Sequence, residues 1–165
     1  MNPGPYIIRK VVRFAHCDPA GIIYYPQYFM LAHDCKEDWF RHAVDYPFRQ
    51  MITDGHRGFP IVKLEAEFVR PSRMRDDLDF AITVRAIGNT SLKLDYLCTC
   101  GEEERARIRT VLVYTDLDAN QPIVIPDWLR ERLARFQKPD VAVVETAQGA
   151  QPVLAPQTAQ VKARA

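Results

Sequence analysis

Four consecutive segments from residue 59 onward alternate between apolar and polar side chains, and this run constrains the fold more than any other feature. Residues 78–87 and 91–100 show the alternation most clearly, and a period of two gives a strand two distinct faces. The links that follow these two segments are short and contain glycine, which favours antiparallel neighbours joined as hairpins. We therefore expect antiparallel strands over residues 59–69, 78–87, 91–100 and 105–117.

Two further elements precede this run. Residues 7–14 are rich in β-branched side chains, which is typical of a strand. Residues 26–44 place a stripe of side chains at three- and four-residue steps, as an amphipathic helix does. The stripe comprises Phe29, Ala32, Lys36, Trp39, Phe40 and Ala43. One helix and five antiparallel strands bury their apolar faces together only if the helix lies across a curved sheet. The sequence therefore predicts an α+β fold, a long helix wrapped by a curved five-stranded antiparallel sheet.

Between the first strand and the helix, the chain forms a tight turn that carries one carboxylate. Residues 16–26 read HCDPAGIIYYP. Pro19 fixes φ and Gly21 permits a positive φ, while Pro26 suits the first turn of a helix. The unpaired N–H groups and positive dipole end of that helix would lie close to Asp18. A carboxylate beside such donors suits acyl transfer, although Asp before Pro is also common as a purely structural turn residue.

Residues 18–26, DPAGIIYYP, resemble the active-site motif of the 4-hydroxybenzoyl-CoA thioesterase family of hotdog-fold enzymes. The resemblance covers residues 6–136 in its pattern of elements. It implies the hotdog fold and hydrolysis of an aromatic, hydroxybenzoyl-type CoA thioester to the free acid and CoA. It also implies that Asp18 is the nucleophile or general base, and that the backbone N–H of Tyr25 polarises the thioester carbonyl. No cofactor is expected, because coenzyme A is part of the substrate.

The resemblance also suggests which other residues contact the substrate. His33 lies two turns into the helix, where that family carries an acid near the acyl ring, and a buried structural histidine is the alternative. Thr90 and Ser91 stand where family members contact the pantetheine chain or order the site across a dimer. We expect apolar walls for an aryl group from Tyr24, Phe59 and Pro60. Cationic contacts to the CoA phosphates are expected from Arg73, Arg75 and Lys93.

The composition is that of an ordinary globular protein, with 47% hydrophobic and 26% charged residues in a chain of 165 residues, a length typical of one domain. The net charge of +1 argues against nucleic-acid binding, which requires many phosphates to be neutralised. No apolar segment is long enough to cross a bilayer, and the chain does not begin with a signal-peptide pattern. We therefore expect a cytoplasmic protein with no nucleic-acid or membrane partner.

The C-terminal part changes character after a final predicted helix at residues 126–136. From residue 138 onward, Ala, Gln, Pro and Val recur without periodicity, so we expect a hotdog domain at residues 1–137 and a flexible tail at 138–165. The four cysteines show neither metal-ligand spacing nor a Cys-x-x-Cys motif. Reduced thiols that pack as small hydrophobic groups, and no metal site, are therefore expected.

A single hotdog unit leaves a sheet edge and half of a ligand groove exposed, so we expect a homodimer or homotetramer with its sites at subunit boundaries. Three other readings compete. Acyl-CoA thioesterases linked to the Tol-Pal system, which act on short-chain or other acyl groups, typically have Tyr-His where this chain has Tyr25-Pro26. A non-catalytic acyl-binding hotdog protein is disfavoured by the intact acid in an intact turn. A hotdog dehydratase requires a catalytic histidine motif that the sequence does not show.

Overall fold

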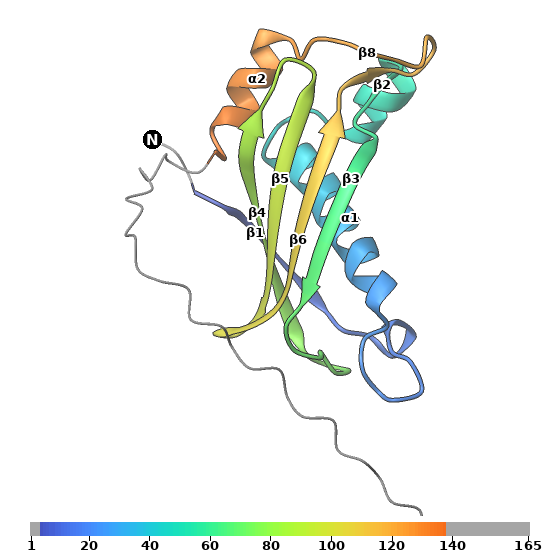
Figure 1. The fold of residues 1–165 in the computed structure, drawn as a ribbon, viewed down its shortest axis with the longest axis vertical. Coiled ribbons are helices and arrows are strands. Elements are labelled where there is room, and N and C mark those ends of the chain that lie inside the picture. The colour runs from blue at the N-terminus through green and yellow to red at the C-terminus, as the bar shows by residue number, and fades with distance from the viewer. Residues whose placement is uncertain (1–3, 138–165) are drawn as a thin grey trace, which may run out of the picture.

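The computed structural model describes residues 4–137, which form a curved sheet and a long helix that lies across one of its faces (Figure 1). The helix is α1 (Tyr25–His42). The sheet has five antiparallel strands in the order β1-β4-β5-β6-β3. The strands are β1 (Tyr6–Val11), β3 (Ile61–Phe68), β4 (Asp77–Ile87), β5 (Ser91–Cys100) and β6 (Glu103–Val113). This is the α+β hotdog fold that the sequence predicts. The predicted tail, residues 138–165, lies outside the described residues.

The core lies between α1 and the inner face of the sheet. Trp39 and Phe40 are fully buried, as the apolar stripe predicts. Phe80 and Ile82 of β4 and Leu94 of β5 are equally buried on the sheet side. Full burial of side chains of this size stabilises the fold by about 1.5–3 kcal/mol each. The stripe therefore decides which side of α1 meets the sheet.

The first predicted strand is shorter than expected. β1 ends at Val11, and the chain then forms a single 3₁₀ turn, η1 (Phe14–His16). The N–H of His16 donates to the carbonyl of Arg13 at 3.0 Å, so this segment bonds to itself rather than to β4. The local turn brings the chain round toward the start of α1.

The last predicted strand is also interrupted. β6 ends at Val113, because the N–H of Tyr114 donates to the carbonyl of Thr90 at 2.7 Å. The chain then leaves the main sheet and forms a small three-stranded sheet in the order β2-β7-β8. These strands are β2 (Arg57–Gly58), β7 (Thr115–Asp116) and β8 (Gln121–Pro122). The predicted final helix is present as α2 (Asp127–Ala134), and a short helical segment, η2 (Arg49–Asp54), follows α1.

β3 forms one edge of the main sheet. It pairs with β6 on one side, and no other strand among the described residues pairs with its outer side. Its apolar side chains are exposed, and they comprise Ile61, Val62, Leu64 and Phe68. An unpaired edge with apolar side chains is a surface that another strand can cover.

No helix within residues 4–137 combines the length and the apolar character needed to span a membrane.

Candidate active site

The turn that carries Asp18 is closed by its own backbone. The N–H of Asp18 donates to the carbonyl of Ile22, and the N–H of Gly21 donates to the carbonyl of Asp18, both at 2.9 Å. Gly21 has a φ of +74°, the left-handed conformation for which the sequence places a glycine there. One carboxylate oxygen of Asp18 accepts the N–H of Ala20 at 2.9 Å. The half-buried carboxylate has no ion-pair partner among the described residues, so its second oxygen is free for other contacts.

The helix that follows presents a free donor beside this turn. Tyr24 is the last extended residue, and its N–H donates to the carbonyl of His16 at 2.9 Å. α1 begins at Tyr25, whose N–H has no acceptor within residues 4–137. The first N–H groups of a helix lack intrahelical partners and lie at the positive end of its dipole. The Tyr25 N–H is therefore suited to stabilise an oxygen that becomes negative.

The segment between β3 and β4 holds the turn in place. The N–H of Ile23 donates to the carbonyl of Ser72 at 2.8 Å, and Ile22 pairs with Arg73 in an isolated antiparallel bridge. The hydroxyl of Tyr28, on α1, donates to the hydroxyl of Ser72 at 2.8 Å, and both residues are buried. These contacts position the Asp18 turn against α1. They also bring the exposed Arg73, predicted to contact CoA phosphates, beside the turn.

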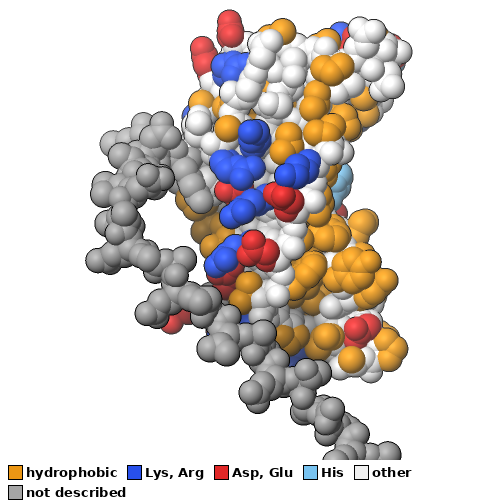
Figure 2. Space-filling view, viewed as in Figure 1, with side chains coloured by type: hydrophobic (Ala, Val, Ile, Leu, Met, Phe, Trp, Pro, Cys, Tyr) orange, Lys and Arg blue, Asp and Glu red, His pale blue; other side chains and the backbone are white. Residues whose placement is uncertain are grey.

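Two hollows lie between α1 and the β3 side of the sheet. The first, of about 340 Å³, adjoins the Asp18 turn, although Asp18 itself does not line it. Its walls are Ile22, Ile23, Tyr25, Tyr28, Phe68, Val69, Arg70 and Pro71. The second, of about 230 Å³, lies further along α1 and is lined by Phe29, Met30, Ala32, His33, Lys36, Ile61, Leu64, Tyr96, Ile108 and Thr110. The ring of Phe29, which lines the second hollow, lies 6.1 Å from the ring of Phe68, which lines the first. Figure 2 shows apolar side chains along this side of the molecule.

His33, predicted to lie near the acyl group, lines the second hollow. It is exposed, and its ring lies 5.9 Å from that of Phe48. Desolvation lowers the pKa of His33, and the positive charge of Lys36 lowers it further. A neutral imidazole is therefore favoured at pH 7, and in each tautomer one ring nitrogen donates a hydrogen bond and the other accepts one.

One protomer does not bring all the predicted residues together. Thr90 and Ser91 lie at the hairpin between β4 and β5, at the opposite end of the sheet from the Asp18 turn (Figure 1). Lys93 follows them on β5. Phe59 is buried in the core against Phe40 and Tyr114, at the same distant end.

Four other predicted residues lie on the surface. Pro60 is exposed just before β3, and Tyr24 is exposed beside the Asp18 turn. Arg73 and Arg75 are exposed in the connection to β4, and Arg75 has a φ of +75°. Tyr24, Arg73 and Arg75 therefore lie at the Asp18 end of the protomer, whereas Pro60 lies with Phe59 at the other end.

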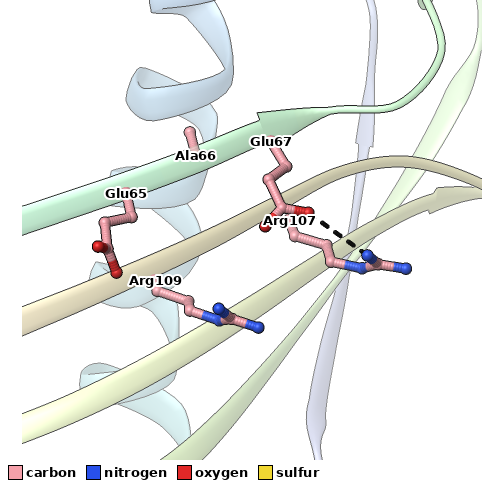
Figure 3. A pocket seen from close by; sticks show the side chains of 5 residues that line it. All are labelled: Glu65, Ala66, Glu67, Arg107 and Arg109. Carbon is pink, nitrogen blue, oxygen red and sulfur yellow. Dashed lines mark hydrogen bonds and ion pairs between the residues drawn. The ribbon is translucent and has the colours of Figure 1, made fainter. Parts of the chain in front are cut away.

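The outer face of the sheet carries arginines that alternate along β6. Arg107 pairs with Glu67 at 3.4 Å, and Arg109 stands opposite Glu65 in the β3–β6 register (Figure 3). Each arginine therefore faces a carboxylate on β3. Figure 2 shows this mixture of positive and negative side chains over the sheet. Charges balanced in this way are typical of a solvated sheet face.

The sequence pattern places Lys36 on the apolar stripe of α1 but does not assign it a role in the site. It is buried there with its neighbours. The sequence does indicate that Lys36 is unusual, because this lysine lies between Ala32 and Trp39 on an otherwise apolar stripe. Among residues 4–137, no group of three or more His, Cys, Asp or Glu side chains is placed to hold a metal ion.

Comparisons with known sequences identify the family. The family model described as the thioesterase-like superfamily matches residues 12–133. A 1,4-dihydroxy-2-naphthoyl-CoA hydrolase from Synechococcus elongatus is 26% identical over 129 residues, which cover 78% of this chain and 94% of the relative. The enzyme of the same description from Thermosynechococcus vestitus is 28% identical over 137 residues, covering 79% of this chain and 92% of the relative.

Solved structures agree on the fold. A 1,4-dihydroxy-2-naphthoyl-CoA thioesterase from Synechocystis superposes with a TM-score of 0.74 at 22% identity, covering 82% of this chain and all of that one. A gentisyl-coenzyme A thioesterase superposes with a TM-score of 0.71 at 22% identity, covering 78% of this chain and all of that one. The chain therefore belongs to the thioesterase-like superfamily and is a hotdog-fold thioester hydrolase.

Proposed function

We propose that the protein hydrolyses the CoA thioester of a hydroxylated aromatic acid, with Asp18 as the nucleophile or general base. One observation carries this proposal: a closed turn holds the Asp18 carboxylate, which has no ion-pair partner among the described residues, and α1 begins shortly after it with the free N–H of Tyr25. Relatives named for naphthoyl-CoA and a structural neighbour named for gentisyl-CoA support an aromatic acyl group. The apolar hollows along α1, one beside the turn and one further along the helix, suit an aryl ring better than a polar chain.

The proposed reaction uses the two groups in sequence. The Tyr25 N–H donates to the thioester oxygen and stabilises the negative charge that develops there. Asp18 then either attacks the carbonyl carbon or removes a proton from an attacking water. In both cases the C–S bond breaks and CoA leaves as the thiolate. If Asp18 attacks, water afterwards hydrolyses the mixed anhydride and regenerates the carboxylate.

We further propose that two copies pair through their β3 edges. Antiparallel neighbours run in opposite directions, so the Phe68 end of one β3 would meet the Ile61 end of the other. That arrangement would bring Thr90, Ser91 and Lys93 of the second copy toward the Asp18 turn of the first. Arg73 and Arg75 would then approach the CoA phosphates from one protomer and Lys93 from the other. The exposed apolar side chains of β3 support this pairing.

The free state of all four cysteines supports a reducing compartment, so we propose that the enzyme works in the cytoplasm.

The test is thiol release from a panel of CoA esters, comprising benzoyl, hydroxybenzoyl, dihydroxynaphthoyl and short aliphatic groups. The aromatic esters should give the highest kcat/KM. Asp18→Asn should lower kcat by about 10²-fold or more, because a positioned acid–base group contributes that much. Asp54→Asn, which removes an exposed carboxylate on η2, is the matched control and should behave as wild type.

The outcomes separate the competing functions. If only the aliphatic esters are hydrolysed, the protein is an aliphatic acyl-CoA thioesterase and the proposed aromatic substrate is wrong. Tight binding of an ester without thiol release would identify an acyl-binding protein instead. Label found in the Asp18 carboxylate after a single turnover in oxygen-18 water would show covalent attack, because general-base catalysis places the label only in the released acid.

A further inference from the structure

A buried ammonium group lies in the wall of the second hollow. Lys36 is only 3% exposed, on the face of α1 that packs against the sheet. No carboxylate within residues 4–137 lies within ion-pair distance of it. The described contact of its Nζ is the ring of Phe48, whose centroid lies 5.7 Å away. Lys36 thus contributes a positive charge to a hollow whose walls are mostly apolar.

A charge in such surroundings needs a partner. Burying an ammonium without an opposite charge or a set of hydrogen bonds is strongly unfavourable. Burial lowers the pKa of Lys36 to about 8, so the amine is still mostly protonated at neutral pH. Lys10 shows the usual arrangement, because its ammonium pairs with Asp38 at 2.9 Å. Lys36 stands on the same helix as Asp38, but no carboxylate of the described residues pairs with it in this way.

A second buried polar group lies in the same hollow. The hydroxyl oxygen of Thr110 interacts with the hydroxyl of Tyr96 but makes no hydrogen bond of normal geometry within the described residues. Thr110 lies on β6, so it faces the hollow from the sheet while Lys36 faces it from the helix. Two buried polar groups that converge on one cavity mark a place for a ligand oxygen.

The hollow has the right position for the far end of an acyl group. Lys36 follows Tyr25 by eleven residues of α1, a rise of about 16 Å along the axis. Side chains of a helix lean toward its N-terminus, which shortens the distance to the Lys36 ammonium. Phe29 and Met30 line the hollow between these two residues. An acyl group held at the Tyr25 N–H would therefore extend along α1 toward Lys36.

We propose that Lys36 is a specificity residue that selects acyl groups carrying an ionised oxygen at the end remote from the thioester. This inference rests on the proposed thioesterase function and deepens it. An ammonium group has three donors and no acceptor, so it favours a carboxylate or phenolate over a neutral substituent. The Thr110 hydroxyl can donate to the same oxygen. The acyl group would then supply the negative partner that Lys36 does not find within residues 4–137.

The test compares three CoA esters of matched shape: 2-naphthoyl, 6-hydroxy-2-naphthoyl and 6-carboxy-2-naphthoyl. The wild type should prefer a substituted ester over 2-naphthoyl-CoA by about tenfold or more in kcat/KM, the range of a charge-assisted hydrogen bond. If only the carboxy ester is preferred, the group that Lys36 recognises is a carboxylate. If both substituted esters are preferred, Lys36 recognises a phenolic oxygen as well.

Variants of Lys36 test whether this lysine causes the preference. Lys36→Met should abolish the preference, because kcat/KM for the substituted esters should fall to the level of 2-naphthoyl-CoA in the same variant. Lys10→Met, which removes a lysine paired outside the hollow, should keep the preference. If Lys36→Met does not fold, Lys36→Gln keeps a hydrogen-bond donor without the charge and should show the same loss. Preference that persists in the folded Lys36 variants would overturn the inference.

Binding provides a readout that does not depend on turnover. Naphthalene-2,6-dicarboxylate should raise the thermal midpoint of the wild type but not that of Lys36→Met. If no ester is hydrolysed yet this difference is present, the thioesterase proposal fails and the anion site stands. If the esters are hydrolysed without preference and the diacid has no effect, the anion site fails alone. A Lys36→Met variant that loses self-association would also overturn the inference, because Lys36 would then pair with a second copy.

Discussion

The proposed chemistry depends on two groups, one in the Asp18 turn and one at the start of α1, and only the first is part of a side chain. The carboxylate of Asp18 is supplied by the residue itself, whereas the oxyanion donor is the main-chain N–H of Tyr25. The ring of Tyr25 packs edge-on against Phe29 and Phe68 and forms part of the wall of the first hollow. The identity of the side chain at position 25 should therefore matter less than the presence of its N–H.

Replacement of Tyr25 by proline tests that donor directly. Proline lacks the N–H but is favoured at the first position of a helix, and the extended Tyr24 is compatible with a following proline. We expect Tyr25→Pro to lower kcat by about 10²–10³-fold, the usual effect of losing one oxyanion donor.

Tyr25→Ala is the matched control, because it removes the same ring but keeps the N–H. It should retain most of the wild-type kcat, with the remaining loss appearing in KM. Equal losses of kcat in the two variants, measured with both folded by circular dichroism, would assign the effect to the ring instead.

Lys36 makes stability depend on pH in a predictable direction. Its pKa in the folded protein is about 8, whereas the ordinary value is 10.5, so between these values the unfolded chain binds more protons than the folded one. The free energy of unfolding therefore rises with pH in this range. The rise has an upper limit of about 3 kcal/mol, at about 1.4 kcal/mol per pKa unit.

Urea unfolding of the wild type and Lys36→Met at several pH values measures this contribution. The wild type should gain stability relative to the variant from pH 8 to pH 10, and the difference should be constant below pH 7. The wild type should show no such gain relative to Lys10→Met, because the pKa of the paired Lys10 is raised rather than lowered. A constant difference between wild type and Lys36→Met across the range would contradict burial of a charged lysine.

The Asp18 turn acts as one element because its own backbone and the segment between β3 and β4 hold it in place. Its own backbone closes it, Ser72 bonds to Ile23, and Tyr28 anchors Ser72 to α1. Gly21 is the point at which this arrangement requires a positive φ. A side chain at this position would meet no neighbouring atom within 4 Å, so only backbone strain opposes substitution.

Gly21→Ala should destabilise the protein by about 1–2 kcal/mol, the usual strain of a non-glycine residue in this conformation. Because the strained turn holds Asp18, kcat should fall as well. Gly101→Ala provides the comparison, since Gly101 also has a positive φ (+58°) and open space around it, but lies in the hairpin between β5 and β6. It should lower the denaturant midpoint similarly and leave kcat unchanged, whereas a normal kcat in Gly21→Ala would show that the turn tolerates distortion.

At the scale of the whole molecule, the single protomer is incomplete as an enzyme. The Asp18 turn and the β4–β5 hairpin lie at opposite ends of the sheet (Figure 1). The β3 edge between them is unpaired among the described residues and carries exposed apolar side chains. Pairing of two such edges would cover that surface and complete each groove with residues from both copies.

Leu64→Lys should weaken that pairing, because a charge on an edge strand opposes association. We expect its molar mass by light scattering to shift toward the monomer and its activity to fall. Leu97→Lys is the matched control, because Leu97 has the same exposure (41% against 40%) but lies on β5, within the sheet. If Leu97→Lys dissociates the assembly and Leu64→Lys does not, the copies associate through the outer face of the sheet instead.

The sequence alone determined the elements, the helical face that is buried and the turn that carries Asp18. These features depend on local patterns: the period of two in the strands, the stripe through Trp39 and Phe40, and the conformational demands of Pro19 and Gly21. Only the tertiary structure decided which distant residues meet. It placed Ser72 against the Asp18 turn, Phe59 in the core, and the last predicted strand partly in a second sheet, because long-range hydrogen bonds act there. It also showed that Lys36 is buried without a carboxylate partner among the described residues, since burial is a property of what packs around a side chain.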